Sequence, residues 1–489
     1  MKPHDRQAPR VAIIGAGFSG IAAAVALRRK GIEDFVIFEK APALGGTWWH
    51  NRYPGAEVDL ESHIYSFSFE RHDWTRTHAD WRELLGYLEG VADKWDLPRR
   101  IRFNEAVEDV AWCDHEHTYT VSTSSGVDHG PFTAVISAVG FLNIPVVPPF
   151  AREDHDFQGA ICHTSRWIDG LDITGKSVAV VGTGSSAVQV VSEATRLASD
   201  VTIFQLEPNW IVPKNSRDFT ARERRINRNP LAYARRRYRL FLDYDRRQIR
   251  SGHARKDGRD NKRRHMTALA FLKRELAARP DLIELTTPKF PFEARRTVLS
   301  DTYYASLCDP KVTLVPHGVK GLTKTGAVDA NGDEHSFDII VMATGFDAAN
   351  YLGNYQVHGQ GGAELHSTWN GEPEAFLGMM VPGFPNFFIM YGPNTNAAPL
   401  VHFYEAQAAF AASLISRAAK TGKTVIDVRR SAFVIYNDWL QAQLGKTVWK
   451  TTNSYFRAGT GKIVSQWPLG ATPYIALTKL LRRVAVRLM

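Results

Sequence analysis

Short, fully apolar runs that end in glycine-rich turns recur along this chain and predict its secondary structure. The run Val11–Ile14 leads into Gly15-Ala16-Gly17-Phe18-Ser19-Gly20, and an alanine-rich stretch, Ile21–Arg29, precedes a second apolar run, Phe35–Phe38. Apolar runs without polar alternation are typical of strands buried on both faces of a parallel sheet, whereas the alanine-rich stretch favours a helix. The segment is therefore predicted to form a strand, a tight turn, a helix and a second strand.

The glycine spacing of this turn predicts a dinucleotide-binding unit. Gly15 permits a tight turn, Gly17 lets the backbone approach a pyrophosphate, and Gly20 lets helix and strand pack closely. The helix N-terminus presents free N–H groups and its positive dipole end to the phosphates. Glu39 lies 24 residues after the first glycine and is predicted to accept hydrogen bonds from a ribose.

The same pattern recurs in the middle of the chain. The run Ser177–Val181 leads into Gly182-Thr183-Gly184-Ser185-Ser186-Ala187, and a second strand-like run, Val201–Gln205, follows a helix-like stretch. Ala187 replaces the third glycine, a change that dinucleotide sites tolerate. Two further apolar runs, Ala134–Phe141 and Ile339–Phe346, resemble each other, and each is predicted to close one unit.

The predicted fold class is therefore α/β, with two Rossmann-like dinucleotide-binding domains and a helical insertion. Two dinucleotide sites in one chain indicate an electron relay between a nicotinamide and a flavin. The predicted FAD-binding domain comprises residues 1–145 and 348–489, and the NADP-binding domain comprises 146–215 and 287–347, interrupted by helices over 216–286. The last stretch, Ile475–Met489, is predicted to form a basic amphipathic helix.

Composition and charge exclude several classes of protein. The chain has 489 residues, of which 44% are hydrophobic and 23% charged, which is ordinary globular composition. Three cysteines are too few for a disulfide scaffold or a cysteine-rich metal site, and no metal site is predicted. No apolar run approaches the roughly 18 residues of a membrane span, and the polar N-terminus leaves no room for a signal peptide, so a cytoplasmic protein is expected.

The positive charge is confined to one segment. The net charge is +9, but residues 217–264 alone carry 18 Lys+Arg against 6 Asp+Glu. A solvated helical surface with a packing stripe is the favoured interpretation of this segment, and Tyr233, Tyr238, Leu240, Phe241 and Leu242 form the expected stripe. No nucleic-acid module accompanies the arginines, so no nucleic-acid partner is expected, while a weak contact with a membrane surface stays open. Oligomeric state is not predicted.

Two further motifs carry a family resemblance. A dense aromatic and glycine segment follows Glu39, and it resembles a fingerprint of class B flavoprotein monooxygenases, filled by Gly46, Trp48, Tyr53, Pro54, Gly55 and Asp59. An aspartate at the last position of this fingerprint is typical of the Baeyer–Villiger branch, so the segment resembles that branch of the family. A second Baeyer–Villiger fingerprint is matched by Phe157, Gly159, His163 and Trp167, with one departure, since Ile168 stands where the family has proline or aspartate.

The resemblance implies the catalytic pair and the cofactor contacts. A basic pair after Phe290-Pro291-Phe292 implies that Arg295 meets the 2′-phosphate of NADPH and that Arg296 is catalytic, held in position by Asp59. For FAD the expected contacts are Gly15, Gly17, Ser19, Gly20, Glu39, Lys40, Gly46, Thr47, Trp48, Asp59, Tyr65, Val107 and Asn394. For the nicotinamide cofactor they are Gly182, Thr183, Gly184, Ser185, Ser186, Ala187, Leu206, Glu207 and Arg295.

The chemistry implied by this resemblance is oxygen insertion into a ketone. NADPH reduces the flavin, reduced flavin and O2 give a C4a-peroxide, and its attack on the carbonyl ends in an ester or lactone. The guanidinium of Arg296 stays charged at any useful pH and can stabilise the anions formed. The alternatives that stay open are an oxygenase acting on sulfur or nitrogen, which would not depend on Arg296, and an uncoupled NADPH oxidase.

Cofactor preference is the point where this chain departs from the family. Leu206 stands where the family usually has an arginine that grips the 2′-phosphate, and Glu207 would repel a phosphate. Arg295 and Lys214 are expected to compensate, so NADPH use with a weakened preference over NADH is predicted. A second departure, Ala397–Val401 in place of a glycine–histidine stretch, falls near the expected substrate pocket.

Overall fold

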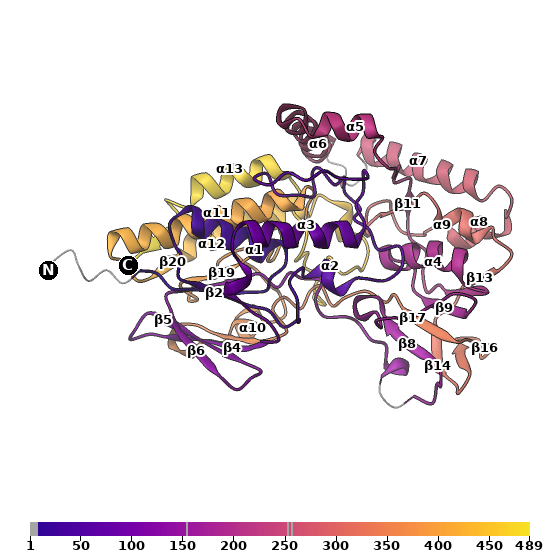
Figure 1. Cartoon of the computed structure of the whole chain (residues 1–489), viewed down its shortest axis with the longest axis horizontal. Helices are drawn as coiled ribbons and strands as arrows, with labels where there is room; N and C mark the ends of the chain where they lie inside the picture. The colour runs from indigo at the N-terminus through magenta and orange to yellow at the C-terminus, as the bar shows by residue number, and fades with distance from the viewer. Residues whose placement is uncertain (1–7, 153–154, 252–253, 256–257) are drawn as a thin grey trace.

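Two parallel sheets, each in its own lobe, organise the molecule (Figure 1). The computed structural model describes residues 8–152, 155–251, 254–255 and 258–489. The first sheet has the order β19-β7-β1-β2-β3, and all its neighbouring strands are parallel. Its strands are β1 Val11–Ile14, β2 Phe35–Phe38, β3 Ile101–Arg102, β7 Ala134–Ser137 and β19 Phe387–Ile389.

The second sheet repeats this topology in the other lobe. Its order is β13-β10-β9-β17-β8, again parallel throughout. In each sheet the strand before the glycine turn lies next to the point where the strand order reverses, which is where nucleotides bind in such folds. The predicted fold class is confirmed. The strands are β8 Ala160–His163, β9 Ser177–Val181, β10 Asp200–Phe204, β13 Val312–Val315 and β17 Ile339–Met342.

Helices cover the faces of both sheets and bury their apolar strands. The helix after the first glycine turn, α1 (Phe18–Arg29), packs against α11 (Leu400–Thr421), and α11 packs in turn against α13 (Ala471–Leu481). The helix after the second turn, α4 (Ser185–Leu197), packs against β9, β10 and α9 (Tyr303–Leu307). The short α2 (Thr47–His50) lies between the two lobes in Figure 1. The remaining helices outside the insertion are α3 Trp81–Lys94, α10 Leu365–Trp369 and α12 Arg430–Leu444.

Smaller sheets complete each lobe. The first lobe carries a four-stranded sheet of order β18-β4-β5-β6, made of β4 Val107–Cys113, β5 Thr118–Thr123, β6 Asp128–Phe132 and β18 Gln356–His358. The second lobe carries the antiparallel set β14 Val319–Leu322, β15 Gly326–Asp329 and β16 Glu334–Ser336. A two-stranded parallel ribbon pairs β11 Ile211–Val212 with β12 Val298–Leu299.

In the described part of the segment between β11 and β12, the chain forms α5 Ala221–Asn227, α6 Pro230–Ser251, α7 Arg259–Glu275 and α8 Asp281–Thr286. The expected packing stripe lies on α6, where Tyr233 is buried and Leu240 and Phe241 pack against the core of the first lobe. Tyr238 was expected in this stripe, but its side chain is mostly exposed. The reason is helical periodicity, because Tyr238 lies five residues after Tyr233 and therefore on another face.

The C-terminus differs from the predicted long helix. The helix α13 ends at Leu481, and Val486–Leu488 form β21, antiparallel to β20 (Ile426–Val428). Pairing with β20 gives the last residues backbone hydrogen bonds, buries Val486 and brings Arg487 to Asp427 at 3.2 Å. Tertiary contact therefore outweighs the helical apolar spacing here.

The described residues contain neither a membrane-crossing helix nor a metal-binding cluster. No helix in that part of the chain combines the length and apolarity needed to cross a membrane. Nor do any three of its histidine, cysteine, aspartate or glutamate side chains gather closely enough to hold a metal ion.

Candidate functional site

The first glycine turn forms a cradle that side chains would fill. Gly15 has φ +102°, and a Cβ atom there would lie 2.8 Å from the carbonyl oxygen of Ala138. A Cβ atom at Gly20 would lie 1.9 Å from the carbonyl oxygen of Gly15. Both positions therefore require glycine, one for the turn and one for the close packing of α1 on β1. The geometry leaves room for a pyrophosphate at the N-terminus of α1.

Glu39 stands at the carboxyl end of β2, beside this cradle. Its carboxylate accepts hydrogen bonds from the backbone N–H groups of Ala16 at 2.8 Å and Ala41 at 2.9 Å. Burial raises the pKa of Glu39, and these two hydrogen bonds partly offset that effect. The carboxylate is thus held rigidly where a ribose would arrive. For the adjacent Lys40, burial lowers the pKa although Glu39 opposes the change.

The remaining residues expected at the flavin lie around the first lobe. Ser19 donates to the carbonyl of Ala138 at 3.1 Å, and the indole of Trp48 donates to the Tyr65 hydroxyl at 3.2 Å. Asn394 donates to the carbonyl of Ile463 at 2.9 Å, but its buried Oδ1 has no partner among the described residues. An orphaned acceptor of this kind fits a cofactor that supplies the missing donor. Thr47 begins α2, Gly46 precedes it, Gly17 packs against Gly46, and Val107 begins β4 and is buried.

The second glycine turn has the same construction. Gly182 has φ +120°, and a Cβ atom there would lie 2.5 Å from the carbonyl oxygen of Ala343. Ala187, at the third position of this turn, is fully buried in α4. Thr183 donates to the carbonyl of Glu207 at 2.6 Å and so ties the turn to the end of β10. Gly184 precedes α4, and Ser185 and Ser186 are its first residues.

The residues expected to choose the nicotinamide cofactor meet at this turn. Arg295 forms an ion pair with Glu207, and its guanidinium lies 4.8 Å from the ring centre of Phe290. Leu206 is 82% exposed and contributes no charge. Lys214 was expected to help bind a phosphate, but that expectation is wrong. Its side chain is only 2% exposed and is paired with Glu57, so it is not available to a nucleotide.

Asp59 and Arg296 form an ion pair between the lobes. One guanidinium nitrogen of Arg296 donates to Oδ2 of Asp59. Burial acts to raise the pKa of Asp59, but the charge of Arg296 and this hydrogen bond together lower it. The charge of Asp59 in turn raises the pKa of Arg296. The Arg296 side chain remains 41% exposed, so a cation that is fixed on one side can meet a ligand on the other.

Two tyrosines beside Arg296, Tyr391 and Tyr455, were not predicted from the sequence. Burial raises the pKa values of Tyr391 and Tyr455, and the Arg296 guanidinium partly offsets the increase. Tyr391 also donates to Asn396 at 2.6 Å. Tyr391 directly precedes the Gly392–Asn396 loop, which could have drawn attention to it. Tyr455 lies in a stretch without a motif, so only the fold brings it to the site.

The segment that contains Asp59 is anchored to the second lobe. The Tyr53 hydroxyl donates to Gln189 of α4 at 2.7 Å. Gly55 has φ +81°, and a Cβ atom there would lie 2.8 Å from the carbonyl oxygen of Gln189. The family fingerprint around Trp48 is therefore, in part, a docking motif between lobes. It brings Asp59 within reach of Arg296.

His163 is held as a neutral ring. Its Nδ1 accepts from the backbone N–H of Ser165 at 3.1 Å, and its Nε2 lies 3.1 Å from the carbonyl of Gly345, to which it can donate. Burial lowers the pKa of His163 to about 4. The ring links the second fingerprint to the end of β17 and contacts no residue of the Asp59–Arg296 pair in these hydrogen bonds. A positioning role follows from this geometry.

Comparison with known proteins gives the family. Residues 12–250 match the model of the pyridine nucleotide-disulphide oxidoreductase family. A Baeyer–Villiger monooxygenase of Pseudomonas aeruginosa is 33% identical over 96% of this chain and 89% of its own length. The crystal structure of cyclohexanone monooxygenase from Rhodococcus sp. Phi1 bound to NADP+ is 27% identical, with a TM-score of 0.87 over 98% of this chain and 99% of the other.

A further solved structure, that of OTEMO in complex with FAD and NADP, is 25% identical and has a TM-score of 0.89 over 99% of both chains. The matched regions cover nearly the whole chain and so include both lobes. The chain therefore belongs to the Baeyer–Villiger monooxygenase family of flavoproteins.

Proposed function

We propose that the protein is an FAD-dependent, NAD(P)H-consuming monooxygenase that inserts one oxygen atom of O2 into a ketone and gives an ester or lactone. The observation that carries this proposal is the Asp59–Arg296 ion pair between two glycine cradles. The NADP-bound cyclohexanone monooxygenase of the same fold supports the cofactor and substrate classes.

In this proposal each lobe binds one of the two cofactors. Residues 1–145 and 348–489 hold FAD, with the pyrophosphate at the N-terminus of α1 and Glu39 on the ribose. Residues 146–215 and 287–347 hold the nicotinamide nucleotide at the N-terminus of α4, and residues 216–286 form the helical insertion. The bound pair of cofactors supplies the reducing equivalents and the activated oxygen.

The chain's own residues orient the substrate and stabilise charge. Arg296 presents a permanent cation to the carbonyl oxygen of the ketone, on which negative charge develops when the carbonyl carbon is attacked. Asp59 holds the guanidinium in that orientation from the opposite side. The buried ring of Tyr391, which lies beside Arg296, shields one side of the pair from water.

Product analysis of the Arg296→Ala variant tests this proposal. The purified wild-type protein should be yellow with FAD and convert cyclic, linear or aromatic ketones with 18O2 into labelled esters or lactones. Arg296→Ala should lose ester formation while it still oxidises NADPH, because the cation acts on the ketone and its adduct. Arg217→Ala, which removes an exposed arginine paired with Glu223, is the matched control and should retain ester formation. A wild-type protein that is colourless and takes up no FAD would refute the proposal.

The same assay separates the alternatives. Oxygenation of sulfides or amines that persists in Arg296→Ala would assign the protein to sulfur or nitrogen oxidation instead. Consumption of NADPH with formation of hydrogen peroxide and no product from any substrate class would indicate an uncoupled oxidase. We further propose a cytoplasmic location.

A further inference from the structure

The helix α6 of the insertion is held to the first lobe by its inner face. On this face Tyr233 is buried, and the buried guanidinium of Arg237 donates a hydrogen bond to the carbonyl of His63 at 2.6 Å. Towards the other end of the helix, Asp245 accepts a hydrogen bond from the backbone N–H of Ala471, the first residue of α13, at 2.7 Å. These contacts fix the rotation of α6 about its axis, so its outer face stays turned to the outside.

The outer face of α6 carries an apolar row. Leu231 is 81% exposed, Tyr238 is 62% exposed, and Leu242 is partly exposed. Successive residues of a helix turn by about 100°, so these three side chains lie within about 40° of one another around the axis. Figure 1 shows α6 at the outer edge of the molecule, away from both parallel sheets. Large apolar side chains aligned on an exposed face indicate a contact surface.

A row of arginines runs beside the apolar row. Arg235, Arg239 and Arg246 are exposed, and the helical rotation places them together, turned by about 60° from the apolar row. In the described part of the chain none of the three forms an ion pair. The exposed acid Asp243 lies about 40° beyond this row, on the side that adjoins Glu61. The outer face therefore combines an apolar row with a parallel row of cations.

An anionic membrane surface fits both rows. In a helix that lies on a bilayer, apolar side chains enter the boundary between headgroups and acyl chains, and arginines on their flank meet lipid phosphates. A nucleic acid would engage the arginines but would leave Leu231 and Leu242 in water. A second copy of the chain would bring another arginine row to the same interface, where like charges repel.

We propose that the outer face of α6 docks the protein reversibly on anionic phospholipid bilayers. The apolar row enters the headgroup boundary, and the arginine row lies against the phosphates. This surface contains none of the residues assigned to the cofactors or to the Asp59–Arg296 pair. The docking surface therefore stands or falls separately from the proposed oxygenation reaction.

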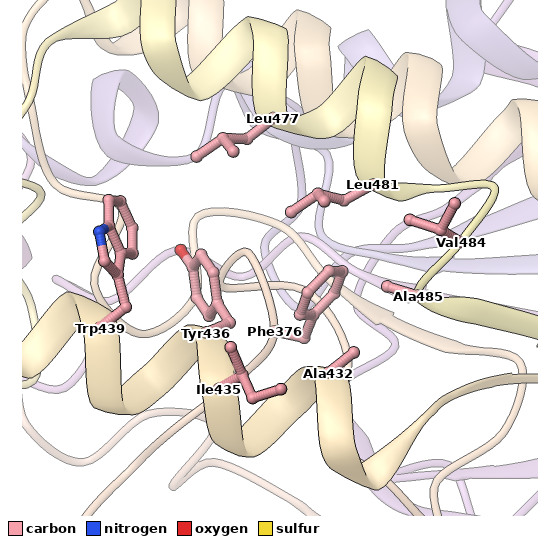
Figure 2. Close-up of a pocket in the computed structure, with 9 residues that line it drawn as sticks. All are labelled: Phe376, Ala432, Ile435, Tyr436, Trp439, Leu477, Leu481, Val484 and Ala485. Atoms are coloured by element: carbon pink, nitrogen blue, oxygen red, sulfur yellow. The ribbon is translucent and has the colours of Figure 1, made fainter.

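A groove between α12 and α13 supplies the matched comparison. Figure 2 shows Ile435 and Val484 among the apolar side chains that line it, and these two are 70% and 66% exposed. They are thus about as exposed as the apolar row of α6. However, α12 contains a single arginine, Arg430, and its exposed surface carries Asp438. Apolar exposure without a flanking row of cations predicts weaker attraction to anionic lipid.

Sedimentation of the full-length, FAD-loaded protein with lipid vesicles tests the proposal. Vesicles of phosphatidylcholine are compared with vesicles that also contain about 30% phosphatidylglycerol. Wild type should bind the anionic vesicles at least about tenfold more tightly, and the difference should shrink as salt increases. Replacing Arg235, Arg239 and Arg246 together by glutamine should weaken binding to anionic vesicles roughly 100-fold, at about 5-fold per cation.

The control for charge removes three cations elsewhere. Arg417, Lys423 and Arg430 are exposed positions of the first lobe, and their joint replacement by glutamine lowers the net charge by the same amount. This triple variant should bind anionic vesicles within about threefold of wild type, because its substitutions lie outside the docking face.

The apolar row gives an independent pair of variants. Leu231→Ser combined with Tyr238→Ser should weaken binding to anionic vesicles about 5- to 20-fold, because less apolar surface enters the headgroup boundary. Ile435→Ser combined with Val484→Ser makes a similar change at the groove in Figure 2 and should leave binding within about threefold of wild type. The flavin spectrum and circular dichroism report whether each variant is folded.

Three results would overturn the proposal. They are the absence of binding to anionic vesicles, an equal loss of binding in the two charge variants, and unchanged binding in the variant that lacks Leu231 and Tyr238. Binding of the wild type to single-stranded RNA without binding to vesicles would assign the arginine row to a nucleic acid instead.

Discussion

The ion pair between Glu207 and Arg295 makes a quantitative prediction about the choice between NADPH and NADH. The family resemblance implies that Arg295 binds the 2′-phosphate of NADPH. In this chain, however, its guanidinium is already paired with the carboxylate of Glu207. A 2′-phosphate bound to Arg295 would therefore share one cation with Glu207. Replacing Glu207 by glutamine keeps the shape of the side chain and removes that competition.

The magnitude follows from the exposure of the pair. The Glu207 side chain is 52% exposed, so the dielectric around it is closer to that of water than to that of the interior. Two unit charges about 4 Å apart in water repel by about 1 kcal/mol, and a phosphate monoester carries about 1.5 to 2 charges. Glu207→Gln should thus favour NADPH by about 1.5 to 2 kcal/mol, which is roughly a 10- to 30-fold gain in selectivity over NADH.

The assay is anaerobic stopped-flow reduction of the bound flavin by each nucleotide. The ratio of the second-order rate constants for NADPH and NADH should rise at least tenfold in Glu207→Gln, and the gain should shrink as ionic strength increases. Glu193→Gln is the matched control, because Glu193 pairs with Arg196 on the exposed surface of α4 at 2.9 Å. A ratio within twofold of wild type, in a variant with normal flavin content, would refute this account of the pair.

Three further predictions concern cofactor selectivity, the contact between the lobes and the pH dependence of stability. Leu206→Arg should raise NADPH selectivity in the same assay, because the side chain is largely exposed and an arginine there adds a free cation; strong native selectivity that the change leaves unaltered would contradict this. Tyr53→Phe should lower the free energy of unfolding by about 1 kcal/mol through loss of the hydrogen bond to Gln189, with urea unfolding as the measurement and an unchanged midpoint as the contrary result. His163 has a folded pKa of about 4, below its unfolded value of about 6.5, so its contribution to stability is present above pH 6.5 and is lost as pH falls towards 4. Wild type should lose about 2 kcal/mol more than His163→Asn between pH 7.5 and pH 5, and parallel pH profiles of the two proteins would exclude the effect.

Much of the fold was predictable from the sequence because the two sheets and their glycine turns depend on local pattern. Continuous apolar runs, glycine turns and the spacing to Glu39 are properties of adjacent residues, and they specified both sheets and the strands that carry the turns. Interactions between segments distant in sequence were harder to foresee. The roles of Tyr455 beside Arg296 and of Lys214 beside Glu57 depend on which loops meet, and no local pattern encodes that.

The C-terminus is a case in which a local pattern predicted the wrong secondary structure. Its apolar spacing fits a helix, yet Val486 pairs with β20 because a strand edge was available there. Helical periodicity was therefore a sound guide as far as Leu481 and failed where a distant partner offered more hydrogen bonds and burial.

The geometry also explains why two acidic residues so close in sequence matter at this site. The parallel ribbon of β11 and β12 ends beside Lys214 on one strand and begins beside Arg296 on the other. The first-lobe segment presents Glu57 to the first cation and Asp59 to the second. The buried pair sets the distance between the lobes, and the more exposed pair inherits a fixed position from it. Arg296 can then remain accessible to a ligand without being free to move, which is the condition for stabilising a charge that appears only during reaction.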